Sequence, residues 1–202
     1  LSTVILAAPI GIAAGMAATA VQGALGWQPL AIPFDRIEAI AGVGPLLKGA
    51  MLMIAPLVLH DLWFYWSHRL EHKLPVLWAF HSLHHSDREM NCTTWARDHF
   101  LQSGWRGFIS VFTLGMIVQL DYMEAGLAAM LGQMAFMLLS MFYHSAIRVE
   151  LPWLDRIVVT PQVHRIHHSV EREHHDSNFA DLFPVMDILF GTYRAPVRGQ
   201  FQ

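Results

Sequence analysis

The chain has 202 residues, enough for a single domain, and its composition is unusually apolar. Hydrophobic residues make up 54% of the chain, and charged residues make up only 14%, against roughly 25% in ordinary soluble domains. The net charge of −3 and the lack of any Lys/Arg run argue against a nucleic-acid partner, while the single cysteine, Cys92, excludes an intrachain disulfide. The sequence therefore predicts one membrane-embedded domain over residues 1–202.

Four apolar runs predict helices that cross a bilayer. Residues 4–26 are uncharged and long enough to span it; a signal peptide is the alternative, although no basic segment precedes the run. Residues 49–66 end in aromatic side chains typical of a membrane interface, and this helix should continue through the polar residues that follow. Residues 105–120 and 125–143 are joined by a short acidic turn, which predicts a transmembrane hairpin, with a buried hairpin of a soluble protein as the alternative.

The distribution of basic residues predicts the orientation of these helices. Eleven of the thirteen lysines and arginines lie in segments 67–106 and 146–202. Four crossings put both segments on the same side, and the positive-inside rule makes that side cytoplasmic, with the links near Asp35 and Asp121 outside. We therefore expect an all-α, integral-membrane (multi-pass) protein of about four transmembrane helices, capped by a cytoplasmic helical domain that holds the histidines.

The histidines are the outlier of the composition, with 13 copies, and most of them form four groups. The first is a pair four residues apart, the second and fourth share the pattern H-x-x-H-H-S, and the third is a lone histidine at the end of the last apolar run. Residues i, i+3 and i+4 share a helix face, so each pattern can present several rings to a metal. The candidate metal ligands are His68, His72, His81, His84, His85, His144, His164, His167 and His168.

Nine imidazoles are too many for one ion and suit two, and one H-x-x-H-H triad can contribute ligands to two adjacent metals. Imidazole suits iron, zinc, copper and nickel. A carboxylate di-iron site would need paired Glu-x-x-His motifs, and only residues 171–174 fit that pattern. Ligand histidines usually donate their second ring N–H to a carboxylate or carbonyl group. Asp61, on the helix face of His68, could accept such a bond, and His99, His175 and Asn178 are further candidates around the ligands.

Three stretches around these histidines resemble the fatty acid hydroxylase/sterol desaturase superfamily of membrane-bound histidine-box oxygenases, particularly its short bacterial members. Residues 61–72, 78–87 and 160–169 look like its three boxes, and residues 178–179 and 187–193 resemble the tail that follows. The resemblance covers about residues 60–194. Departures at Ala180, Met186 and Phe100 remove no box histidine, but they blur the subfamily and hence the substrate.

The resemblance implies a di-iron oxygenase, an O2-dependent oxidoreductase that hydroxylates or desaturates a C–H bond of a lipid-like substrate. It implies two iron ions, which zinc can replace during purification, with O2 as co-substrate. It also implies electrons from a separate reductase, ferredoxin or cytochrome-b5-like donor, because no Gly-rich dinucleotide fingerprint occurs in the sequence. The alternatives are a zinc-dependent membrane hydrolase, although no His-Glu-x-x-His motif is present, and a non-catalytic metal-binding membrane module.

Overall fold

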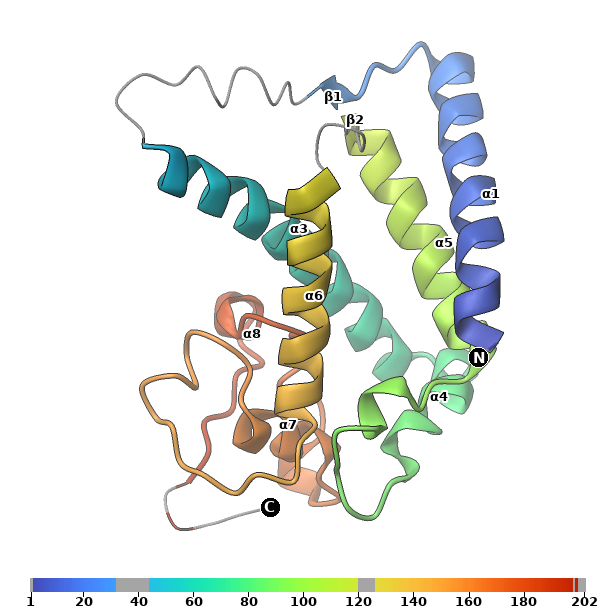
Figure 1. Ribbon diagram of the computed structural model, residues 1–202. Helices are drawn as coiled ribbons and strands as arrows, with labels where there is room; N and C mark the ends of the chain where they lie inside the picture. Colours follow the sequence, from blue (N-terminus) through green and yellow to red (C-terminus); the bar gives the residue numbers. More distant parts are fainter. Residues whose placement is uncertain (1, 32–43, 120–125, 198, 200–202) are drawn as a thin grey trace. The chain divides into compact units, whose positions relative to one another are not determined.

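The computed structural model describes residues 2–31, 44–119, 126–197 and 199, and its main elements are helices (Figure 1). The long helices are α1 (Ser2–Leu25), α3 (Pro45–Lys73), α5 (Phe100–Ile117) and α6 (Gly126–Tyr143). The short ones are α4 (Pro75–His81), α7 (Pro161–His168) and α8 (Val185–Leu189), with 3-10 turns η1 (His84–Ser86), η2 (Thr94–Ala96) and η3 (Arg172–His174).

The prediction of an all-α fold is confirmed, with one small addition. The two-residue strands β1 (Leu30–Ala31) and β2 (Val118–Gln119) pair in parallel, with Leu30 opposite Val118. The four predicted apolar runs coincide with α1, α3, α5 and α6, and α3 does continue through His68 and His72. Within the described residues, no helix combines the length and apolar character needed to cross a bilayer. The predicted outside links, near Asp35 and Asp121, lie outside the described residues.

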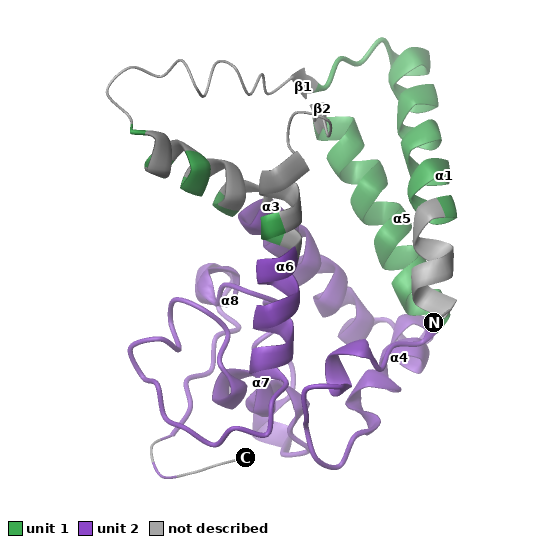
Figure 2. Cartoon of the chain, in the orientation of Figure 1, with its two compact units in different colours: residues 1–55, 100–132 green, residues 56–99, 133–202 purple. Residues whose placement is uncertain are grey.

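The chain divides into two compact units (Figure 2), and the prediction of a single domain over residues 1–202 remains a prediction. The first unit contains residues 1–55 and 100–132. In it α1 packs along α5 through small residues: Ala14 and Ala18 are buried, and a Cβ added to Gly115 would lie 3.3 Å from the Cβ of Ala18. The side chain of Gln22 reinforces this close approach by donating a 2.8 Å hydrogen bond to the carbonyl of Gly115.

The second unit, residues 56–99 and 133–202, contains all nine candidate ligands. Its core joins the end of α3 and the end of α6 to the segments around α7 and α8. The buried members of this core are Tyr65, Tyr143, Val159, Val163, Phe179, Ala180, Leu182 and Met186. Because α7 is covered on almost every side, the three histidines that it carries are fixed by packing before any ligand binds.

Candidate metal centre

Five histidines converge at the end of α3. His68 and His72 lie one helical turn apart on α3, as their spacing predicts. Both rings point toward the ring of His81, the last residue of α4. The Nε2 atom of His81 lies 3.0 Å from that of His68, 3.1 Å from that of His72 and 3.0 Å from that of His85. Potential ligand atoms within 4.8 Å of one another come from His68, His72, His81, His85 and His167.

A second group of four histidines lies beside the first. The Nε2 atom of His164 is 3.0 Å from that of His144 and 3.0 Å from that of His168, while His144 and His84 approach to 3.3 Å. The two groups are adjacent, because the rings of His85 and His168 stack with centroids 4.2 Å apart. All nine candidate ligands therefore gather in two neighbouring groups, which we call the five-histidine group and the four-histidine group.

Each H-x-x-H-H triad divides between the two groups. The triad that begins at His81 gives its first and last rings to the five-histidine group and its middle ring, His84, to the four-histidine group. The triad of α7 does the reverse: His164 and His168 join the four-histidine group, and His167 joins the other. Positions i and i+4 thus serve one group while position i+3 serves its neighbour.

Several rings are oriented by hydrogen bonds from Nδ1. His68 donates to the carbonyl of Phe179 at 2.8 Å, His167 to that of Ser177 at 2.9 Å, and His144 to that of Ser140 at 2.8 Å. A carbonyl oxygen can only accept, so in each neutral ring the proton lies on Nδ1 and Nε2 keeps its lone pair. Nδ1 of His81 lies 3.3 Å from a carboxylate oxygen of the fully buried Glu71, which has the same effect.

These tautomers make a metal fit the five-histidine group. The Nε2 atoms of His68 and His81 both carry lone pairs, yet they lie 3.0 Å apart, where no hydrogen bond can join them. A cation bound by both nitrogens removes this repulsion. With metal–nitrogen bonds of about 2.1 Å, two ligands at a right angle lie about 3.0 Å apart, and two tetrahedral ligands about 3.4 Å apart. The donor set therefore fits a metal ion with nearly right-angled ligands.

Burial favours the neutral form of three rings in the four-histidine group. It lowers the pKa of His144 to about 4, and it lowers the pKa values of His164 and His168 well below their ordinary value. The neighbouring histidines add to the lowering for His164 and His168 because protonating several rings at once would bring like charges together. Neutral imidazole is the form that binds a metal, so these three rings are in the form suited to ligation at neutral pH.

Two buried carboxylates accept hydrogen bonds from the backbone amides of residues 179–183, the segment whose first carbonyl orients His68. Asp187 accepts from the backbone amides of Phe179 and Ala180 at 2.8 Å each. Asp61 accepts from the next three amides, of residues 181–183, at 2.8–2.9 Å. The helix position of Asp61 suggested that it would accept from the ring of His68. Its carboxylate instead accepts from these backbone amides, and the ring of His68 donates to the carbonyl of Phe179.

The remaining candidates lie around the groups without joining them. Asn178 donates to the carbonyls of Val163 and Arg194 and accepts from the amide of Arg194, which ties α7 to the C-terminal tail. The ring of His99 stacks on Phe80 with centroids 5.0 Å apart, and His175 is exposed.

The sequence reasoning missed Glu71 and Asp187. A signal for each was present in the sequence, since Glu71 lies between the two histidines of the first box and Asp187 in the tail. Both are carboxylates in otherwise apolar or histidine-rich stretches, and the structure buries both completely. Buried carboxylates need hydrogen-bond donors, and here they bind a ring nitrogen and backbone amides.

Comparison with known proteins matches residues 53–192 to the family model described as fatty acid hydroxylase. Human alkylglycerol monooxygenase is 32% identical over 67% of this chain and 29% of its own length. An ornithine lipid hydroxylase of Rhizobium tropici is 29% identical over 74% of this chain and 44% of its own, and a Delta(7)-sterol 5(6)-desaturase of Gibberella zeae is 27% identical over 73% and 43%. The chain thus spans less than half the length of these relatives. No solved structure matches it.

Proposed function

The chain belongs to the fatty acid hydroxylase family, and on that premise we propose that it oxidises a C–H bond of a lipid-like substrate at a two-iron centre held by its nine clustered histidines. The reaction is a hydroxylation or a desaturation that uses O2 and two electrons from a separate donor. The relatives are named as a monooxygenase, a hydroxylase and a desaturase of lipids, which supports this class of reaction.

One observation carries the proposal: nine imidazole nitrogens converge in two adjacent groups of five and four. Structural zinc takes four ligands in a tetrahedron, so the five-histidine group has one ligand too many for it. The spacings of 3.0–3.1 Å between its nitrogens also match right-angled ligands better than tetrahedral ones. Iron accepts such an all-imidazole set, and two bound iron ions would supply the activation of O2.

The surrounding protein keeps the clustered histidine rings neutral, fixes their orientation and shields them from water. Nδ1 bonds to buried carbonyls fix the rings of His68, His144 and His167. The phenyl ring of Phe179 lies against three rings of the five-histidine group, with centroids 5.3–5.7 Å apart, and it excludes water from that side. Tyr143 covers the other group in the same way, 4.6 Å from the ring of His144. Such shielding protects a reactive centre from side reactions.

We also propose that the chain is an integral-membrane protein whose histidine-bearing unit faces the cytoplasm. The apolar composition and the distribution of basic residues support this. So do large apolar side chains that α1 leaves more than half exposed, Ile12, Met16 and Leu25, because a bilayer would cover them. A lipid-like substrate would then reach the metal centre from within the bilayer.

The test compares full-length wild-type protein with His85→Ala, which removes one ring of the five-histidine group. After anaerobic loading with Fe(II), the wild type should hold about two iron ions per chain, and the variant should hold less iron. Lipid extracts of cells that express the wild type, grown under O2 labelled with heavy oxygen, should contain a labelled alcohol or a new alkene. The variant should form neither product, because the loss of one ligand weakens iron binding in the five-histidine group.

His175→Ala is the matched control, because His175 is exposed and outside both groups. It should keep both iron and product. Normal turnover by His85→Ala would contradict the assignment of the ligands. Hydrolysis of a lipid by the zinc-loaded protein without O2 would contradict the proposed reaction.

A further inference from the structure

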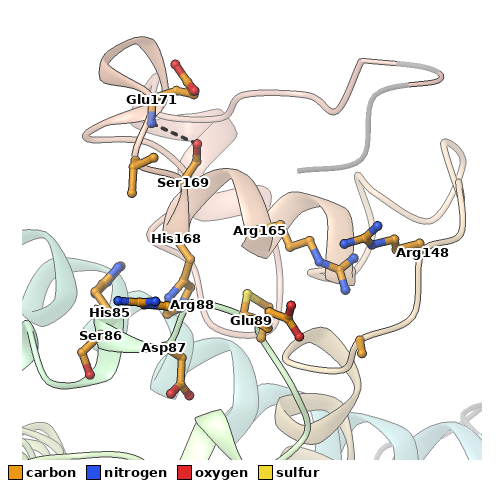
Figure 3. A pocket seen from close by; sticks show the side chains of 13 residues that line it. His85, Ser86, Asp87, Arg88, Glu89, Arg148, Arg165, His168, Ser169 and Glu171 are labelled. Carbon is orange, nitrogen blue, oxygen red and sulfur yellow. Dashed lines mark hydrogen bonds between the residues drawn. The ribbon is translucent and has the colours of Figure 1, made fainter.

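A cavity of about 620 Å³ opens beside the two histidine groups (Figure 3). Its wall includes His85 from the five-histidine group and His168 from the four-histidine group, the two rings that stack on each other. The rest of the wall comes from residues 86–90, from Ala146 and Arg148 after α6, from Arg165, and from residues 169–171. A molecule in this cavity would therefore touch both groups at the place where they meet.

Charged side chains line much of the cavity, which distinguishes it from a tunnel for an acyl chain. Its charged lining residues are Arg88, Arg148 and Arg165, with Asp87, Glu89 and Glu171. Sites that hold apolar ligands are lined mainly by hydrophobic and aromatic side chains. The equal numbers of acidic and basic residues also make the cavity a poor electrostatic target for an acidic protein, which a surplus of positive charge would attract. A small polar group fits this lining best.

Arg165 is a buried, hydrogen-bonded residue of this wall and not a solvated surface residue. It follows His164 on α7, is buried, and donates to the carbonyls of Ile147 at 2.8 Å and Ser145 at 2.9 Å. These two bonds leave further N–H groups of the guanidinium available. Burial lowers the pKa of Arg165, and the positive charge of Arg148 lowers it further.

Arg148 places a second guanidinium beside the first. Figure 3 shows the two arginine side chains close together on one side of the cavity. Among the described residues, neither of the two forms an ion pair with a carboxylate. Two neighbouring cations, one of them buried, repel each other, and an anion bound between them would relieve that repulsion. Guanidinium groups bind phosphate and carboxylate through paired hydrogen bonds.

We propose that this cavity binds the head group of the lipid substrate and that Arg148 and Arg165 hold an anionic group of that head, a phosphate or a carboxylate. The inference rests on the proposed function and narrows it to lipids with an anionic head group. Since the cavity is bounded by one ring of each histidine group, the head group lies next to the centre.

The test uses Arg148→Gln, because Arg165 also supports the backbone and its replacement would disturb the fold. The metal-loaded full chain in detergent, without reductant, is titrated with dioctanoyl phosphatidic acid and with the neutral dioctanoylglycerol. The wild type should bind the anionic lipid at least about tenfold more tightly, and Arg148→Gln should lose about tenfold for that lipid alone, as expected for one charge-assisted contact. Arg172→Gln, an exposed arginine outside the cavity, is the matched control and should change neither affinity.

Three results would overturn the inference. The first is equal binding of the two lipids by the wild type. The second is a loss in Arg148→Gln no larger than in Arg172→Gln. The third is inorganic phosphate that competes as well as the anionic lipid, which would mark a site for free phosphate. No turnover is measured, so a negative result here does not contradict the two-iron centre. The iron content of the titrated protein is measured separately, so failure of the proposed function is distinguished from failure of this inference.

Discussion

At the residue scale, the orientation of His68 depends on two carboxylates that belong to neither histidine group. Asp187 and Asp61 together satisfy five consecutive backbone amides, from residue 179 to residue 183. The same segment presents the carbonyl that fixes the ring of His68. A buried amide that loses its acceptor costs about 1–3 kcal/mol, so these carboxylates support both the fold and the ligand geometry.

Asp187→Asn should therefore weaken both stability and metal binding. The carboxylate of Asp187 accepts from two amides and from the hydroxyl of Thr192, and an amide side chain would turn one of its acceptors into a donor that faces another donor. We expect the free energy of unfolding to fall by about 2–3 kcal/mol and iron to dissociate faster. Chemical denaturation and the rate of iron transfer to a chelator measure the two effects.

The control is Asp176→Asn. Asp176 is exposed and pairs with Lys73 at the surface, where an ion pair contributes about 0–1 kcal/mol. Both Asp and Asn tolerate its positive φ of 60°. Equal effects of the two substitutions would contradict a special role for Asp187.

The sequence predicts which histidines cluster better than it predicts what orients their rings. The nine histidines carry their own spacing signal, so the pattern alone brings out every member of both groups. Asp61 was placed on the helix face of His68 by spacing, but its partners are amides about 120 residues away in the chain. Helix periodicity gives the face of a residue and says nothing about the segment that packs opposite it.

At the element scale, α7 is the helix on which the site depends most. It has eight residues, and three of them are candidate ligands. Its start is fixed by Thr160, which accepts from the amide of Val163 and donates to the carboxylate of Asp155 at 2.6 Å, and by Pro161 at the first helical position. A helix this short has little stability of its own, so its cap and its packing hold it.

Thr160→Ala should lower the free energy of unfolding by about 1 kcal/mol, the usual cost of a lost N-cap. It should also loosen the rings of His164 and His168, so that bound metal is lost at a lower chelator concentration. Thr160→Ser keeps the hydroxyl and should behave like the wild type. Thermal unfolding and chelator titration of the three proteins measure these changes, and a Thr160→Ser variant as weak as Thr160→Ala would argue against the cap.

The long helices were predictable because each contains an apolar run long enough for several helical turns. The predicted run at residues 4–26 and the helix α1, Ser2–Leu25, differ by two residues or fewer at each end. The helical turn expected around His81 is less regular: α4 ends at that residue and a separate 3-10 turn begins at His84. The break separates His81, in the five-histidine group, from His84, in the four-histidine group.

At the scale of the whole molecule, the proposed membrane topology places the histidines on the cytoplasmic side. Cys92 reports on it directly, because it is exposed, is the only cysteine of the sequence, and lies in the histidine-bearing unit. A membrane-impermeant maleimide should leave Cys92 unlabelled in sealed cells and label it after permeabilisation.

The matched variant moves the single reactive cysteine to the link near residue 35, which is predicted to lie outside the cell. With Cys92 replaced by serine, Asp35→Cys should react with the same reagent in sealed cells. Labelling of Cys92 before permeabilisation would show that the positive-inside interpretation is wrong.

The exchange of rings between the two H-x-x-H-H triads ties the two metal positions together. Each triad is one short stretch of backbone, so an ion in the five-histidine group and an ion in the four-histidine group would be held by the same two segments, residues 81–85 and 164–168. A distortion of either segment would therefore reach both metal positions at once.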